Sequence, residues 1–246
     1  MSSLLGNAPL QAAKDPLPAS THTWFGDVKP QIYNYDVDVR IALPQALPAA
    51  GLYFAAIQTN FEKHDEWGHG GLQWVDGVKK INWGGGSETG YGKTYDNEES
   101  KILQDFEWKP NNWYRYRVWR IEKDQTGYWR WLFAIQDYSN GKDLQIGSLR
   151  TVSEWISGAV VWLETGWGAS GVQCTTEKAT VEWRNPLYRC TTPGVFTPGS
   201  ATADYNGSCG SDNSTNQVLT SSAPYTWRQE TNSKRKTAAG AKLWQV

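Results

Sequence analysis

The sequence lacks the motifs and the charge imbalance that mark several large functional classes. It has no Gly-Xaa-Ser-Xaa-Gly segment, no phosphate-binding loop and no Cys-Xaa-Xaa-Cys pair, so serine-elbow hydrolases, nucleotide binding and zinc ribbons have no support. No apolar run reaches the roughly 18 residues that a membrane span needs. The 24 lysines and arginines nearly cancel the 25 aspartates and glutamates. No strong field therefore attracts nucleic acid or anionic lipid.

Cysteine is scarce, and all three cysteines lie in the last third of the chain. Because the number is odd, it defines no complete disulfide framework. One disulfide plus one free thiol fits a secreted protein, as either Cys190–Cys209 or Cys174–Cys190. The N-terminus has neither the basic region nor an apolar run of the length that a secretory signal peptide needs. We therefore expect a secreted or extracellular protein whose chain carries no signal peptide.

Tryptophan and turn residues are in excess. Tryptophan occurs 15 times against six phenylalanines, and there are 24 glycines and 11 prolines. A core that needed only bulk would use leucine, isoleucine and phenylalanine, so we expect some of the flat indole rings to be exposed for binding. Many short alternating segments separated by turn residues predict an all-β fold, an antiparallel β-sandwich of the jelly-roll type.

The hydrophobic pattern also places the strands. We expect them at 31–43, 51–61, 71–75, 78–83, 101–108, 113–122, 128–136, 142–150, 157–164 and 179–183. Asp76-Gly77 predicts a tight hairpin turn, and Pro186 is expected to close the last strand. The chain is therefore divided into a partly mobile leader at 1–22, a sandwich at 23–190 and a loop-rich extension at 191–246 packed on the sandwich.

The clearest strand pair lies within 113–137. One face of its second strand is wholly apolar and predicts core, and one face of its first strand mixes indole rings with guanidinium groups. Such a mixed face is expected to be partly exposed to solvent, and sugar rings or nucleobases stack on surfaces of this kind. The apolar residues are Trp129, Trp131, Phe133 and Ile135, and the mixed ones are Trp113, Arg115, Arg117, Trp119 and Ile121.

A second concentration of polar and aromatic side chains surrounds a glycine-rich segment. It comprises Gln58, Asn60, His64, Glu66, Trp67, His69, Gln73, Trp74, Asn82 and Trp83. The spacing of His64 and His69 does not match the helical two-histidine zinc pattern, so we predict no metal ligands there. We expect no cofactor, with a structural calcium ion as the one metal that the sequence leaves open.

One carboxylate stands out as a candidate for chemistry. Glycoside hydrolysis needs two carboxyl groups that face each other, and Glu164 ends an apolar strand, where a charge is costly unless it is used or paired. The pattern favours the ordinary role for this residue, an ion pair at the strand end with Arg117 or Arg130 as its partner.

Three segments resemble concanavalin-A-like jelly-roll proteins, namely WYRYRVWR followed by GYWRWLFAIQD, then SGAVVWLE and ATVEW. This family includes lectins, laminarinase-like hydrolases and polysaccharide lyases, and the resemblance spans residues 23–190. The laminarinase motif Glu-Xaa-Asp-Xaa-Xaa-Glu is met only by Glu122-Lys-Asp124-Gln-Thr-Gly127, which lacks its last glutamate. The segments GHGGLQW and NWGGG are similar to those of secreted bacterial domains of unknown activity, which supply no catalytic residue.

We therefore predict a secreted protein that binds a polysaccharide or other glycan on one sheet face. Aromatic rings stack on the apolar faces of sugars, and planar amides and guanidinium groups bond paired hydroxyls. Trp74 and Trp83 alternate with Gln73 and Asn82, and alternation leaves open which of the two sets points inward. We place Gln73 and Asn82 at the ligand, which puts the two indoles in the core. The predicted ligand-binding residues are Trp67, His69, Gln73, Asn82, Arg117, Trp119, Gln136 and Glu164.

Two alternatives remain open. The first is a polysaccharide lyase or glycoside hydrolase on the same scaffold, in which a lyase would draw on His69, Tyr116 and Arg117. The second is single-stranded nucleic-acid binding, because tryptophan interleaved with arginine also makes a stacking platform. The near-zero net charge argues against it, so we expect no nucleic-acid partner.

Overall fold

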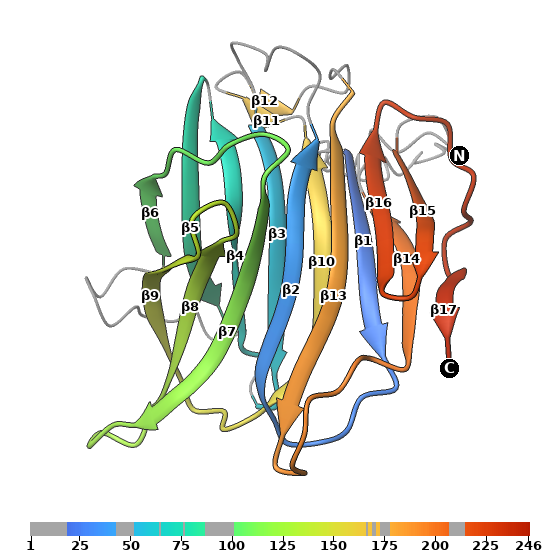
Figure 1. Ribbon diagram of the computed structural model, residues 1–246. Helices are drawn as coiled ribbons and strands as arrows, with labels where there is room; N and C mark the ends of the chain where they lie inside the picture. The colour runs from blue at the N-terminus through green and yellow to red at the C-terminus, as the bar shows by residue number, and fades with distance from the viewer. Residues whose placement is uncertain are drawn as a thin grey trace, which may run out of the picture.

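The structure is a computed structural model that describes residues 19–42, 52–63, 65–75, 77–86, 101–165, 167–168, 171–172, 178–206 and 215–246. It confirms the predicted all-β antiparallel sandwich. The strands stack in two layers (Figure 1). Within the described ranges, no helix is long and apolar enough to cross a membrane.

The front layer of Figure 1 contains, in spatial order, β15 (Thr215–Ser222), β16 (Tyr225–Thr231), β13 (Thr180–Cys190), β2 (Ile32–Ala42), β7 (Trp113–Lys123), β8 (Trp129–Asp137) and β9 (Lys142–Thr151). The back layer contains β6 (Lys101–Asp105), β5 (Val78–Gly86), β4 (Trp67–Val75), β3 (Leu52–Phe61), β10 (Ile156–Thr165), β1 (Ala19–Gly26), β14 (Ser200–Asn206) and β17 (Lys242–Gln245). A short hairpin, β11 (Trp167–Gly168) with β12 (Gly171–Val172), lies apart from them. The layers join where Ile32 pairs with Ile156.

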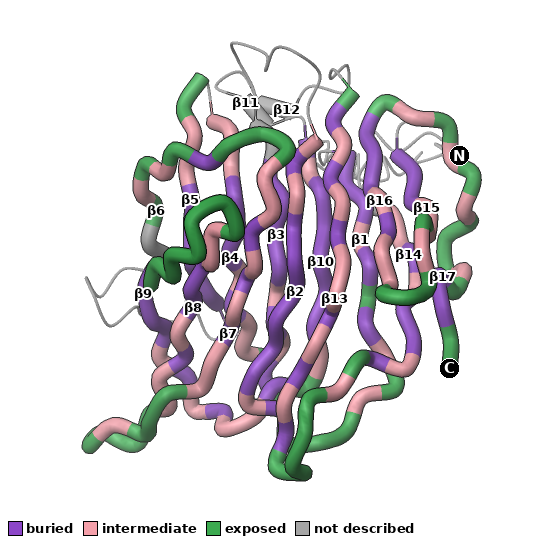
Figure 2. Tube along the Cα trace, in the orientation of Figure 1, coloured by how far each residue is buried: buried purple, intermediate pink, exposed green. Residues whose placement is uncertain are grey.

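The core fills the space between the layers, because alternate side chains of each strand point inward. Figure 2 shows the resulting burial along the central strands. The predicted apolar face of β8 is part of this core, with Trp131 and Phe133 wholly buried. The core also takes many of the indole rings, of which the sequence led us to expect some at the surface. The tryptophans of this core are Trp83, Trp108, Trp131, Trp183, Trp227 and Trp244. Trp162 is buried in a separate cluster, and Trp24 is 39% exposed.

Two glycines of the glycine-rich segment make room for one of these rings. A Cβ atom added at Gly68 would lie 2.7 Å from the indole of Trp83, and one at Gly70 would lie 2.9 Å from it. Trp83 in turn stacks on Phe133 of the opposite layer, with ring centres 5.2 Å apart. These glycines therefore serve core packing, and the expected core position of Trp83 agrees with its burial.

Both ends of the chain contribute more to the sandwich than the sequence suggested. β1 begins at Ala19, inside the predicted leader, and pairs with β10 and β14; residues 1–18 lie outside the described part. The predicted loop-rich extension supplies β14 to β17. A buried hydrogen-bond network ties these strands to β1: Thr23 bonds with Gln217, Trp227 and Gln229, and Gln229 also accepts from Trp183.

Two local predictions need correction. Pro186 does not close β13, which continues to Cys190 past a bulge between Arg184 and Leu187; at a bulge the missing N–H of proline is tolerated. Cys190, which both predicted disulfides require, is a buried free thiol, whereas Cys174 and Cys209 lie outside the described residues. The tight hairpin was expected correctly, since Val75 pairs with Val78.

Candidate active site

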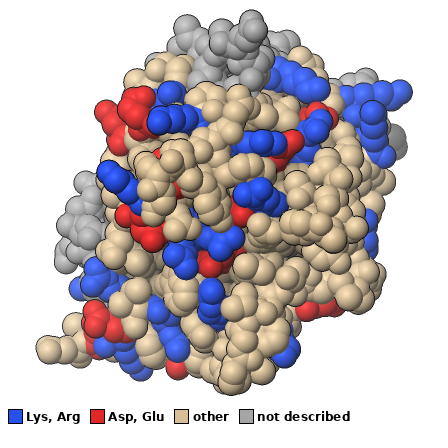
Figure 3. Space-filling model, viewed as in Figure 1, with Lys and Arg blue, Asp and Glu red and all other residues tan. Residues whose placement is uncertain are grey.

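The sandwich has two outer faces, and their carboxylates differ in environment. The front face is the outer surface of the front layer, and Figure 3 shows basic and acidic side chains interspersed across it. Its central carboxylates, Asp36 and Asp38, are wholly buried and held by arginines. They are therefore unsuited to meet a substrate or to accept its proton.

The back face is the outer surface of the back layer, and its centre is formed by β1, β10, β3 and β4. Strand alternation and register place the outward side chains of these strands. They are Ser20, His22 and Trp24 of β1, Gly158, Val160, Trp162 and Glu164 of β10, Phe54, Ala56, Gln58 and Asn60 of β3, and Trp67, His69, Gly71 and Gln73 of β4.

A small apolar floor lies beneath these groups. Phe54, Ala56, Val160 and Trp162 form a buried cluster separate from the main core. Aromatic and imidazole rings continue the cluster outward: His69 contacts Phe54, Trp162 and Trp67 with ring centres 5.8, 5.6 and 4.9 Å apart. His22 approaches Trp162 at 5.9 Å from the other side. An apolar floor bordered by two imidazoles thus occupies the centre of the back face.

Two groups on this floor have unusual electrostatics. Burial lowers the pKa of His22, an effect that the nearby Asp204 carboxylate partly opposes, so the ring is neutral near pH 7. Nε1 of Trp162 is buried without a hydrogen-bond partner among the described residues. A buried donor in this condition is costly, and it marks a place where an acceptor would be favoured.

Glu164 lies at one end of the same floor. It is directly opposite Ser20 on one side and Phe54 on the other. Because Trp162 is opposite His22, His22 and Glu164 are diagonal neighbours, with backbone positions about 7–8 Å apart by strand geometry. The face thus brings together a carboxylate, a neutral imidazole and an indole N–H.

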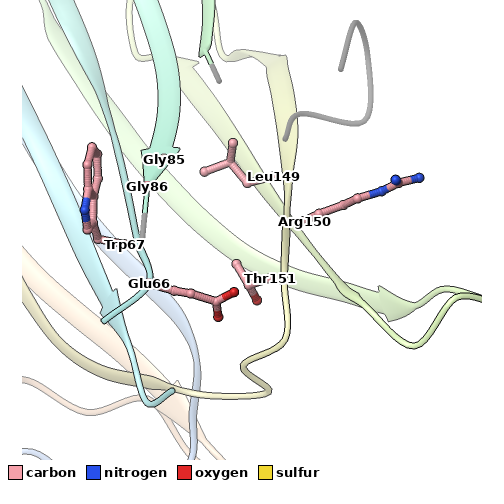
Figure 4. A pocket seen from close by; sticks show the side chains of 7 residues that line it. All are labelled: Glu66, Trp67, Gly85, Gly86, Leu149, Arg150 and Thr151. Atoms are coloured by element: carbon pink, nitrogen blue, oxygen red, sulfur yellow. The ribbon is translucent and has the colours of Figure 1, made fainter. Parts of the chain in front are cut away.

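A small hollow opens where β4 begins and β5 ends. It is lined by Glu66, Trp67, Gly85, Gly86, Leu149, Arg150 and Thr151 (Figure 4). Its carboxylate is fully engaged, since Glu66 accepts from the backbone N–H of Val152 and from both the N–H and the hydroxyl of Ser153. These bonds fasten the β9–β10 connection to β4. We therefore assign this hollow a structural role.

Comparison with known proteins gives a fold relationship. No family model matches the chain, and no curated protein matches it. Solved structures of scytalido-glutamic peptidase match with TM-scores of 0.53, in complex with a peptide-based transition state analogue, and 0.51, with a transition state analogue inhibitor. Both alignments cover 87% of this chain and 97% of that chain at 8% identity. This chain shares its fold with these peptidases.

The comparison corrects the prediction of a carbohydrate-binding protein. The two solved structures with which this chain shares its fold are of a peptidase, not of a lectin. The structure also shows why one glycan site does not form: the predicted residues lie on opposite faces. Trp67, His69, Gln73, Asn82 and Glu164 belong to the back layer, whereas Arg117, Trp119 and Gln136 belong to the front face.

The predicted residues of the back layer are not equivalent. Trp67, His69 and Glu164 border the apolar floor, and Gln73 lies opposite Phe54. Asn82 is buried, and its side-chain oxygen accepts from the N–H of Gly71, so it holds β5 to β4. His64 lies outside the described residues.

Sequence reasoning missed three residues of this face, His22, Phe54 and Trp162. His22 fell in the segment taken as a leader, although Thr21, Thr23 and Phe25 alternate with it as strand residues do. Phe54 and Trp162 lie in strands that are apolar on both faces, so periodicity did not separate core from outer floor.

Proposed function

We propose that this protein is a hydrolase that cleaves amide bonds of polypeptides at the back face, with Glu164 as the group that activates water. Support comes from the shared fold with peptidases that bind peptide-based transition state analogues. The observation that carries the proposal is the juxtaposition of Glu164 with the neutral ring of His22 and the orphan indole N–H of Trp162.

In the proposed reaction the Glu164 carboxylate accepts a proton from water as the water oxygen bonds to the carbonyl carbon of the substrate. The carbonyl oxygen becomes an oxyanion, to which the N–H of neutral His22 donates. The C–N bond then breaks, and the proton held by Glu164 passes to the leaving amine. Atoms and charge balance without a cofactor.

The enzyme alternatives from sequence fit this structure less well. Tyr116 is buried in the core, where its hydroxyl donates to the carbonyl of Ala55, and Arg117 lies on the front face, so the lyase set of His69, Tyr116 and Arg117 is not assembled. A glycoside hydrolase needs two carboxyl groups close together. Among the described residues, neither strand adjacent to Glu164 carries another outward carboxylate.

The test is cleavage of fluorescein-labelled casein by the purified protein between about pH 3 and 8, a range in which carboxylates and histidines titrate. We expect Glu164→Gln to lower the rate by about 100-fold or more, the usual effect of removing a general base. Glu122→Gln is the matched control, since this glutamate lies at the end of β7 with 62% of its side chain exposed. Absence of wild-type cleavage across the range, or equal loss in both folded variants, would overturn the proposal.

A further inference from the structure

The front face carries an ordered set of arginines that the proposed hydrolysis does not use. Asp38, on β2, accepts from Nε of Arg115 at 2.7 Å and from Nε of Arg184 at 3.2 Å. The Nδ2 of Asn185 and the hydroxyl of Tyr138 complete its shell at 2.9 and 3.0 Å. We call this group the Asp38 clamp. Its four donors leave the carboxylate saturated and wholly buried.

A second group of the same kind lies two residues along β2. Nη1 of Arg189 donates to Asp36 at 3.2 Å and to Asn34, whose amide donates to Asp36 at 2.8 Å. Nε of Arg117 approaches Asp36 at 3.7 Å from the other flank. We call this group the Asp36 clamp. Each clamp thus sets one arginine of β7 and one of β13 around a buried aspartate of β2.

Aromatic rings lie beside these guanidinium groups. Arg184 stacks over Trp113 at 3.9 Å, with Arg40 over the same ring at 4.7 Å. Arg189 and Arg117 lie over Trp119 at 5.1 and 5.7 Å. The arginine side chains are still 20 to 33% exposed. Arg115 lies over the ring of Tyr138 at 5.8 Å. Held by an aspartate on one side and an aromatic ring on the other, these arginines present their outer edges in fixed positions.

Stability alone does not account for this arrangement. Burying an ion pair on a sheet costs desolvation that well-packed apolar residues of similar size would avoid. The Nε atoms of Arg115 and Arg184 bond Asp38, but their terminal nitrogens have no hydrogen-bond partner within the described residues. Two guanidinium groups around one carboxylate also leave a positive charge. A pre-organised site with spare donors is the arrangement that binds an anion.

The separation of the clamps indicates the shape of the anion. Asp36 and Asp38 are two residues apart on one strand, about 6.8 Å from the strand rise. Acidic side chains at alternate positions of an extended peptide have the same spacing and point to one side. We propose that the front face docks an extended acidic peptide along β2, with one carboxylate on each clamp. Asp143, 3.8 Å from Arg117, partly compensates the Asp36 clamp, so the Asp38 clamp is the stronger of the two.

Binding is tested by fluorescence polarisation with two labelled peptides of equal composition. One has glutamates at alternate positions among serines and glycines, and the other has the same glutamates in adjacent pairs. We expect the alternating peptide to bind about tenfold more tightly, because only its carboxylates reach both clamps from one side. Measurements on Glu164→Gln as well as wild type keep the result independent of cleavage at the back face. Equal affinity for the two peptides would overturn the proposal.

Variants separate positioned donors from simple charge attraction. Arg184→Lys keeps the positive charge but loses the planar guanidinium, whose paired N–H groups can bond both oxygens of a carboxylate. We therefore expect about tenfold weaker binding. Arg130→Lys, on β8 and paired with Glu122, is the matched control and should leave affinity unchanged. Asp38→Asn makes the net charge of the face more positive but no longer holds Arg115 and Arg184 in place. If positioned donors bind the peptide, the variant binds it more weakly. If only the total charge matters, the variant binds it more tightly.

Two outcomes contradict the acidic-peptide assignment. Tighter binding by folded Asp38→Asn, or no change in Arg184→Lys, would show that the arginines act only through bulk charge. A single-stranded oligothymidine that binds more tightly than the alternating peptide, and loses affinity in Arg184→Lys, would assign the clamps to nucleic acid. If Asp38→Asn does not fold, the comparison of Arg184→Lys with Arg130→Lys still decides.

Discussion

Nε1 of Trp227 donates a hydrogen bond to Oγ1 of Thr23 at 2.9 Å, across 204 positions of sequence. Gln229 donates to the same hydroxyl, which itself donates to Gln217. All four side chains are buried. This junction explains why the polar C-terminal segment belongs to the sandwich: its strands complete the hydrogen bonds of β1 inside the core.

Removal of this hydroxyl should destabilise the whole protein. Thr23→Val preserves shape but leaves the N–H groups of Trp227 and Gln229 without their acceptor. We expect a loss of about 3 kcal/mol in the free energy of unfolding, from a cost of roughly 1–3 kcal/mol for each buried unsatisfied group. Urea denaturation measures it. Thr220→Val, at an exposed position of β15, should change stability by less than about 0.5 kcal/mol; similar losses in both variants would contradict the role given to the junction.

The packing role of the glycine-rich segment is testable by adding one methyl group. Gly68→Ala would place a Cβ atom 2.7 Å from Trp83 and 2.8 Å from Leu149, so we expect a loss of about 1–3 kcal/mol from overpacking. Gly158→Ala is the control on β10, where nothing lies within 4 Å of the added atom. A thermal melt of each variant suffices. Equal melting temperatures would show that Trp83 moves aside at little cost.

The Glu66 carboxylate should hold the β9–β10 connection. Glu66→Ala removes the acceptor of two backbone N–H groups and of the Ser153 hydroxyl. We expect a loss of about 2–3 kcal/mol, together with faster amide exchange at Val152 and Ser153. Glu62→Ala, an exposed neighbour, is the control. Unchanged exchange rates at these two amides would contradict the view that Glu66 holds the β9–β10 connection in place.

His22 should make stability depend on pH. Burial lowers its pKa in the folded state, so the unfolded chain binds more protons as pH falls below the ordinary histidine value of about 6.5. The stability that the neutral ring contributes is complete above that pH and is lost as pH falls toward the folded pKa. Denaturation at about pH 7.5 and 5 should therefore show a smaller pH effect in His22→Gln than in wild type. An identical pH effect in the two proteins would contradict the burial of this ring.

The sequence by itself determined the fold class and much of the inside-outside pattern. Period-2 alternation separated Trp131 and Phe133 from their polar neighbours, because in a half-buried strand burial follows every second residue. It did not decide whether Asn82 or Trp83 points inward, because alternation alone does not say which face of a strand is buried.

Only the tertiary structure decided which outward residues meet. Alternation divides a strand into two faces but does not say to which layer of a sandwich the strand belongs, since that depends on pairing between distant segments. Arg117 and His69 both point outward, yet from opposite faces. His22 joins Trp162 because β1 pairs with β10, and the arginines of β7 and β13 meet because β2 lies between them.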